Sequence, residues 1–171
     1  MNKNLFLLAL ALTLSCSANQ GPLKHPMDKS ESKTIKLENG LKVYLLSDPD
    51  FNVCAASMSV EVGSYQDPDN RQGMAHFLEH MLFLGTEKYP DVDEYSTYLK
   101  TFGGYSNAYT AGDHTNYQLQ VLPDGFEGSL DRFAQFFISP LFTEEYTSRE
   151  VNAVNSEYQK NIMNDGWRQY R

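Results

Sequence analysis

The chain has 171 residues, of which 41% are hydrophobic and 13% aromatic, and its formal net charge at pH 7 is -8. This length predicts a single domain, and the aromatic content argues against a disordered chain. Because the chain is acidic, it has no electrostatic reason to bind nucleic acid or an anionic membrane, and we expect no nucleic-acid partner.

The N-terminus carries the pattern of a secretory signal peptide. A short basic start, MNKN, precedes the apolar run LFLLALALTL at residues 5–14, and small residues follow it. Such a run is too short to span a bilayer as a helix, but it is typical of the centre of a signal peptide. We therefore predict a signal peptide over residues 1–18 and export, to the periplasm of a bacterium.

Two processing routes remain open for this segment. Cleavage after Ala18 would release a soluble protein, whereas lipid attachment at Cys16 would anchor the chain to a membrane as a lipoprotein. On either route Cys16 is removed or modified. Cys54 then has no partner, so we predict no internal disulfide and place Cys54 in a strand as a small core residue.

Polar residues 19–32 follow, and we interpret them as a flexible tether. Residues 34–46, TIKLENGLKVYLL, place two β-rich runs on either side of Asn39 and Gly40, which is a strong hairpin signal. A third strand is expected in residues 53–64.

Two helices are predicted next, at residues 74–84 and 91–102, with Asp91 as a candidate N-cap and Gly85 as a stop. Residues 105–123 alternate and predict two strands with a turn near 111–113. An amphipathic helix is expected at 125–139 and a long helical stretch from Thr143 onward. The order β-β-β-α-α-β-β-α-α predicts an α+β fold, with helices packed on an antiparallel or mixed sheet.

The stretch HFLEH, residues 76–80, is a candidate metal site. On a helix, His76 and His80 face the same way and can reach one point in space. A catalytic zinc takes three protein ligands and a water, and imidazole nitrogen is a favoured ligand. Glu79 lies on nearly the same face, where it could act as the base that takes a proton from the metal-bound water.

The surroundings of this motif favour a metal over a solvated helix face. Apart from its three polar residues, the segment MAHFLEHMLFLG is apolar. Burying two imidazoles and a carboxylate costs several kcal/mol, on the order of the penalty for unpaired polar groups, unless they are paired or bound to metal.

A third ligand must come from elsewhere in the chain. The last predicted helix offers four glutamates: Glu144, Glu145, Glu150 and Glu157. Glu150 and Glu157 are two turns apart and share one face, so that one could bind zinc while the other supports a ligand histidine through its second ring nitrogen. The spacing alone does not choose between them.

Four segments resemble the pitrilysin and insulin-degrading enzyme group of HxxEH zinc metallopeptidases, the inverzincins. They read HFLEHMLFLGTEKYPDVDEYSTYL, GGYSNAYTAGDHTNYQLQV, LDRFAQFFISPLF and REVNAVNSEYQKNIMNDGWR. With the preceding hairpin, the resemblance covers residues 33–171. It implies an N-terminal zinc peptidase domain of the LuxS/MPP-like type, with helices on one face of a mixed, mostly antiparallel sheet.

The resemblance also implies roles for individual residues. His76, His80 and Glu157 would bind zinc, Glu79 would be the catalytic base, and Glu150 would orient a ligand histidine. A peptide substrate would add as an extra strand beside Ser106, Asn107, Ala108 and Tyr109, the binding mode called β-augmentation. His114 receives no role from the family and is interpreted as a structural histidine.

Members of the group consist of several related domains that form two halves around the peptide. The resemblance thus implies that this domain is C-terminally truncated and that the missing half, or a complementing chain, supplies further substrate contacts. We expect a zinc-dependent endopeptidase of oligopeptides that is weakly active or inactive as this chain alone. The alternatives are a non-catalytic subunit and a metal-carrying module of the same fold.

Overall fold

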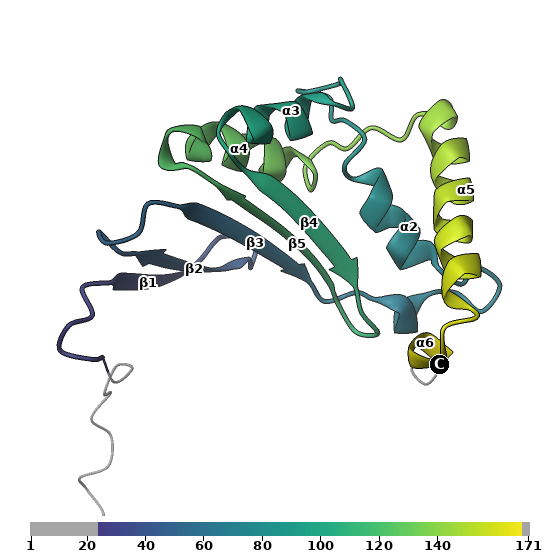
Figure 1. Cartoon of the computed structure of the whole chain (residues 1–171), viewed down its shortest axis with the longest axis horizontal. Helices are drawn as coiled ribbons and strands as arrows, with labels where there is room; N and C mark the ends of the chain where they lie inside the picture. Colours follow the sequence, from purple (N-terminus) through teal and green to yellow (C-terminus); the bar gives the residue numbers. More distant parts are fainter. Residues whose placement is uncertain (1–23, 169–171) are drawn as a thin grey trace, which may run out of the picture. The chain divides into compact units, whose positions relative to one another are not determined.

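The structure is a computed structural model that describes residues 24–168 (Figure 1). The expected signal peptide, its Cys16 and the first part of the expected tether lie outside the described residues. The chain divides into two compact units, Met1–Asp50 and Phe51–Arg171.

The described part of the first unit is a β-hairpin. Strands β1 (Glu31–Lys36) and β2 (Lys42–Ser47) pair antiparallel, with Ile35 opposite Val43. At the turn, Gly40 has a positive φ of 92°, which glycine adopts readily, and the Leu41 N–H donates to Asn39 Oδ1 at 3.1 Å. The hairpin predicted from Asn39 and Gly40 is confirmed, and β1 begins inside the segment expected to be a tether.

A three-stranded antiparallel sheet forms the base of the second unit. Its strands are β3 (Cys54–Val60), β4 (Tyr105–Thr110) and β5 (Thr115–Val121), in the order β3-β5-β4. All strand pairings within residues 24–168 are antiparallel. The α+β class is therefore confirmed.

Alternation along β5 decides which face of the sheet carries the core. Thr115, Tyr117, Leu119 and Val121 are buried, whereas the residues between them are partly or fully exposed. The helices α2 (Met74–Met81), α3 (Glu94–Thr101), α4 (Pro123–Gln135) and α5 (Glu144–Asn161) lie on one side of this sheet (Figure 1). The core between them is formed by Leu82, Tyr95, Leu99, Tyr117, Leu119, Val121, Phe133 and Phe136.

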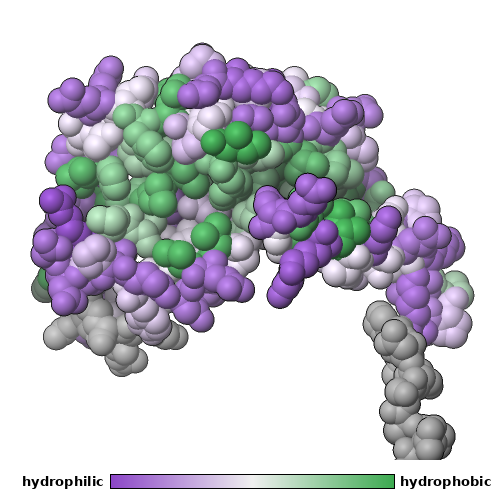
Figure 2. All heavy atoms as spheres, turned by 180° about the vertical axis from the view of Figure 1, so that it is seen from behind, coloured by the Kyte–Doolittle hydropathy of each residue, from purple (hydrophilic) through white to green (hydrophobic). Residues whose placement is uncertain are grey.

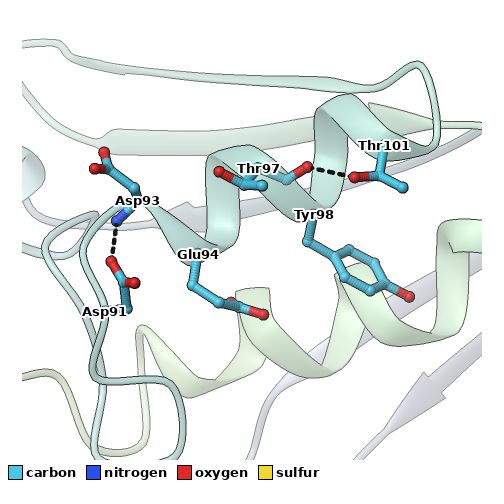
Figure 3. Close-up of a pocket in the computed structure, with 6 residues that line it drawn as sticks. All are labelled: Asp91, Asp93, Glu94, Thr97, Tyr98 and Thr101. Carbon is cyan, nitrogen blue, oxygen red and sulfur yellow. Dashed lines mark hydrogen bonds between the residues drawn. The ribbon is translucent and has the colours of Figure 1, made fainter.

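The helices begin and end at slightly different residues from those predicted. Asp91 is not the N-cap of α3: its carboxylate accepts from the Asp93 N–H at 2.9 Å and closes a turn that precedes the helix (Figure 3). Helix α4 starts at Pro123, because proline is suited to the first helical position. The long C-terminal helix is interrupted after Asn161, where Asn164 Oδ1 accepts the Gly166 N–H at 2.9 Å and starts the short α6 (Asp165–Arg168). A single turn, η1 (Ser64–Gln66), was not predicted.

Apolar side chains remain on the surface. Hydrophobic residues gather over part of the face seen in Figure 2, between polar margins. Helix α5 buries none of its residues fully and leaves Val151 and Tyr158 exposed. No helix among residues 24–168 is both long and apolar enough to cross a membrane.

Two core tyrosines should make the fold less stable at alkaline pH. Burial raises the pKa of Tyr95 to about 12, and burial with the nearby Glu79 carboxylate raises that of Tyr117 to about 12. Unfolded tyrosines ionise near pH 10, so between roughly pH 10 and 12 the folded state holds protons that the unfolded state has lost. The free energy of unfolding should therefore fall across this range, by at most about 2–3 kcal/mol per tyrosine. Urea unfolding from pH 9 to 12 tests this, and Tyr117→Phe should flatten the dependence; an unchanged slope would contradict it.

Candidate metal centre

Helix α2 is fixed at its N-terminus by a carboxylate from the preceding loop. Gly73 occupies the N-cap with a positive φ of 90° and has no side chain to cap the helix. The Asp67 side chain caps the helix instead. One of its carboxylate oxygens accepts from the Gly73 N–H at 2.7 Å and the other from the Ala75 N–H at 2.8 Å. These bonds satisfy N–H groups that a helix start would otherwise leave unpaired, and they place a negative charge at the positive end of the helix.

The two motif histidines lie side by side one turn apart on α2. Their Nε2 atoms are 3.2 Å apart, and their ring planes meet at 81°. The side chain of His80 is 21% exposed and that of His76 is 35% exposed. The spacing predicted from the sequence thus brings both ring nitrogens to one place.

Helix α5 brings a carboxylate to the same place. Glu157 Oε2 lies 3.6 Å from His76 Nε2, and Glu157 Oε1 lies 3.9 Å from His80 Nε2. His76, His80 and Glu157 each offer one ligand atom, and these three atoms all lie within 4.8 Å of one another. Among the described residues this is the one group of three or more histidine, cysteine or acidic side chains so placed.

The three groups fit a zinc ion. Tetrahedral zinc with bonds of about 2.0–2.1 Å holds its ligand atoms roughly 3.3–3.4 Å apart. The two Nε2 atoms are 3.2 Å apart, and each histidine has a different Glu157 oxygen near this separation, Oε2 at 3.6 Å from His76 and Oε1 at 3.9 Å from His80. Two imidazoles and one carboxylate are also a ligand set found in catalytic zinc sites.

Glu150 determines which nitrogen of His80 faces this cluster. Its Oε2 lies 2.9 Å from His80 Nδ1, and both side chains are largely buried, at 19% and 21% exposure. An ionised carboxylate can only accept, so Nδ1 carries the proton and Nε2 presents a lone pair toward His76 and Glu157. Glu150 and Glu157 therefore lie on one face of α5, two turns apart, and contact different ring nitrogens: Glu150 contacts Nδ1 of His80, whereas Glu157 lies near the Nε2 atoms of both histidines.

Glu79 lies on the side of α2 that is covered by the sheet. It is 7% exposed, and its Oε2 accepts a hydrogen bond of 2.7 Å from the Thr110 hydroxyl at the end of β4. The carboxylate is also close enough to Tyr117 to help raise the pKa of that phenol. This nearly buried carboxylate, which directly precedes His80 in the chain, is thus held by a single neutral hydroxyl among the described residues.

The residues expected to contact substrate lie on β4, a terminal strand of the described sheet. Ser106 and Ala108 are half-buried toward the helices, and Asn107 and Tyr109 are exposed on the other face. His114 stands in the turn after this strand, where Nδ1 contacts Asp113 at 2.7 Å and Nε2 contacts the Tyr109 hydroxyl at 3.3 Å. The hydrogen bond from His114 lowers the pKa of Asp113.

Among the described residues, Cys54 is a half-buried free thiol.

A separate pocket of about 310 Å³ lies along α3 (Figure 3). It is lined by Asp91, Asp93, Glu94, Thr97, Tyr98 and Thr101, and so by none of the residues of the metal cluster. The candidate site is therefore the junction of α2 with α5 rather than this pocket.

Two residues that support the site were not found from the sequence. Asp67 lies six residues before the N-cap, outside the window in which capping residues are usually sought. Thr110 shares the inward face of β4 with Ser106 and Ala108, but only the packing of α2 against β4 brings it to Glu79.

An HxxEH helix on an α+β domain, with a carboxylate from a later helix beside both histidines, defines the class of the inverzincin metallopeptidases. The chain belongs to the insulinase family (Peptidase family M16), whose family model matches residues 42–171. This is the group that the four sequence segments resemble, so that prediction is confirmed.

Individual relatives agree with this assignment. Human insulin-degrading enzyme is 53% identical over 148 residues, which cover 86% of this chain and 14% of the human protein. A Schizosaccharomyces pombe protein whose name contains the words zinc protease is 51% identical over 145 residues, 85% of this chain and 15% of the relative. A crystal structure of pitrilysin matches with a TM-score of 0.78 and 41% identity, and covers 84% of this chain and 15% of that chain. The chain thus spans about one seventh of the length of these relatives.

The cap that Asp67 provides gives a stability prediction. Replacing Asp67 by Ala removes both bonds to the first turn of α2 and should lower the free energy of unfolding by about 1–2 kcal/mol. The matched control is Asp69→Ala, an exposed residue of the same loop, which should change stability by less than about 0.5 kcal/mol. Urea unfolding of both variants measures the difference. Equal effects of the two substitutions would contradict the capping role.

Proposed function

We propose that the chain carries the zinc centre of a peptide-hydrolysing site, with His76, His80 and Glu157 as ligands and Glu79 as the base. The observation that carries this proposal is the convergence of one ligand atom from each of His76, His80 and Glu157, on a helix that also carries the nearly buried Glu79. Membership of a peptidase family and the zinc protease name of one relative support it. Zinc, when bound, would supply Lewis-acid polarisation of the scissile carbonyl and lower the pKa of a water.

Glu150 and Glu79 would have separate roles in the reaction: Glu150 orients a ligand and Glu79 transfers a proton. Glu150 accepts a hydrogen bond from His80 Nδ1–H and so keeps the His80 ring oriented with its Nε2 lone pair toward the ligand cluster. Glu79 takes a proton from the attacking water and returns it to the nitrogen of the departing amine, which converts a poor leaving group into a neutral one. Because Glu79 is only 7% exposed, it is largely shielded from bulk water.

The substrate class that we propose is an extended oligopeptide. Ser106, Asn107, Ala108 and Tyr109 lie on β4, which ends the described sheet and can accept another strand through main-chain hydrogen bonds. Such binding uses the backbone of the peptide, so it places few demands on its side chains. Strand β4 also carries Thr110, which contacts Glu79, so a peptide on this edge would lie near the base.

Two further proposals concern the whole protein. This chain covers 14–15% of its relatives, so we propose that further residues, in the same or a complementing chain, are needed for efficient cleavage. From residues 1–18 we propose export to a bacterial periplasm, either as a soluble protein or with a lipid on Cys16. The intact mass of the processed chain would distinguish these two forms.

Zinc binding should depend in a graded way on the ligands of the cluster and on Glu150, which contacts one of them. We expect one zinc per chain, with affinity reduced at least about 100-fold by His80→Ala or Glu157→Ala, because each removes a direct ligand. Glu150→Gln should weaken binding by about 10–100-fold, because it removes only the partner of His80 Nδ1. The control is Glu145→Gln, an exposed residue in the first turn of α5. Competition with a zinc-chelating dye measures all four; wild-type affinity in Glu157→Ala would exclude that ligand.

Glu79→Gln should separate hydrolysis from metal binding. It removes the base but keeps the shape of the side chain, so zinc stoichiometry should stay the same while cleavage of a fluorogenic peptide falls by about 100-fold or more. The assay uses high concentrations of the zinc-loaded chain and long incubations, because we expect slow cleavage by these 171 residues alone. Glu87→Gln, at an exposed position, is the control. Cleavage unchanged in Glu79→Gln would exclude Glu79 as the base, and no cleavage by the zinc-loaded wild-type chain would favour a metal-binding module without catalysis.

A further inference from the structure

The hydroxyl of Thr110 is the one side-chain donor to Glu79 among the described residues. Its distance to Glu79 Oε2 is 2.7 Å. An ionised carboxylate has no proton to give, so the Thr110 hydroxyl must donate and its single proton lies on this contact. Hydrogen bonds of this kind, from a neutral donor to a buried charge, are stronger than those between neutral groups.

Thr110 is itself held by the sheet rather than by a flexible loop. It is the last residue of β4 and is paired in register with Thr115 of β5. The Thr115 hydroxyl, in a residue that is only 4% exposed, donates to the Val62 carbonyl at 2.8 Å and lies 3.4 Å from the Thr110 hydroxyl. Threonine also has few side-chain rotamers in a strand, because two heavy atoms branch from its Cβ. The position of the Thr110 hydroxyl is therefore determined by the backbone of the sheet.

We propose that Thr110 is a positioning residue for the catalytic base: it holds one oxygen of Glu79 and leaves the other, Oε1, for the proton of the attacking water. This inference rests on the proposed function. A base works within a narrow range of distance and direction, and a rotation of the carboxylate about its terminal bond would exchange the two oxygens. The bond to Thr110 opposes that rotation, and it does so from an element that carries no metal ligand.

The pairing also gives the Glu79 carboxylate a hydrogen-bond donor in a nearly buried place. The carboxylate is 7% exposed, and no cation from Lys or Arg pairs with it among the described residues. A buried carboxylate that loses its only hydrogen-bond donor is left with the full penalty of desolvation. The loss should therefore appear in stability as well as in catalysis, and only when Glu79 is present.

A double-mutant cycle tests this coupling without any activity measurement. Thr110→Val keeps the shape of the side chain and removes the hydroxyl, and we expect it to lower the unfolding midpoint by about 3–10 °C in the full chain. In the Glu79→Met background the same change should lower the midpoint by less than about 2 °C or raise it, because no carboxylate then needs a donor. Thr34→Val, at an exposed position of β1, is the control for replacing a strand threonine. Equal losses in both backgrounds would mean a purely structural role and would overturn the inference.

The conservative variant and the infrared spectrum complete the test. Thr110→Ser retains a hydroxyl and should restore the midpoint and the position of the Glu79 carboxylate band, which is identified by subtraction of the Glu79→Gln spectrum and should shift in Thr110→Val. A band unmoved in Thr110→Val would overturn the inference. In the peptide assay, Thr110→Val should lower kcat about 10–100-fold, with KM within about threefold and zinc stoichiometry unchanged.

The two proposals fail in different ways. If Glu79→Gln leaves peptide cleavage unchanged, the proposed function is wrong, whereas the unfolding cycle and the carboxylate band still report whether Thr110 holds Glu79. If Glu79→Gln abolishes cleavage but Thr110→Val shows neither coupling nor a kinetic effect, the base is right and the positioning role of Thr110 is wrong.

Discussion

The structure of the site depends on the contact between the imidazoles of α2 and the glutamates of α5. Glu150 accepts a hydrogen bond from His80 Nδ1–H, so the Nε2 lone pair of His80 faces His76 and the Glu157 carboxylate. Three acceptors brought this close repel one another unless a proton or a cation lies among them. Helix α5 buries none of its residues fully, so apolar packing contributes less to its attachment than it does for α3 or α4. A cation at the cluster would therefore stabilise the docking of α5 and the fold at the same time.

Helix α2 is supported at three places, and each support comes from a different element. The Asp67 carboxylate fixes the first turn, Thr110 on β4 holds Glu79, and Glu150 on α5 orients His80. The loop that carries Asp67 is in turn bonded to the β4–β5 turn, through Ser64 N–H to Ala111 and Tyr65 N–H to Gly112. Glu79 and the two histidines thus share helix α2 but are positioned by separate contacts. A change at the sheet can then affect Glu79 without moving the histidines.

Local signals in the sequence predicted the parts of this arrangement that are local in the chain. The spacing of His76 and His80, the Asn39 and Gly40 turn and the alternation of β5 each follow from residues a few positions apart, and each was correct. The spacing of the glutamates on α5 left the choice between Glu150 and Glu157 as the third ligand open. Which of them reaches His76 depends on how α5 packs against α2, and this is decided by contacts far apart in the sequence. The resemblance to a known family, rather than periodicity, selected Glu157.

The same reasoning explains which residues were missed. Asp67 caps a helix whose N-cap is six residues away, and Thr110 meets Glu79 across 31 positions of the chain. Neither residue has an unusual neighbourhood in the sequence, because an aspartate in a polar loop and a threonine in a strand are ordinary. Their importance comes from the group that they contact. A polar residue on the inward face of a strand, next to a buried charge on the helix above it, is therefore a general place to look for residues that position a base.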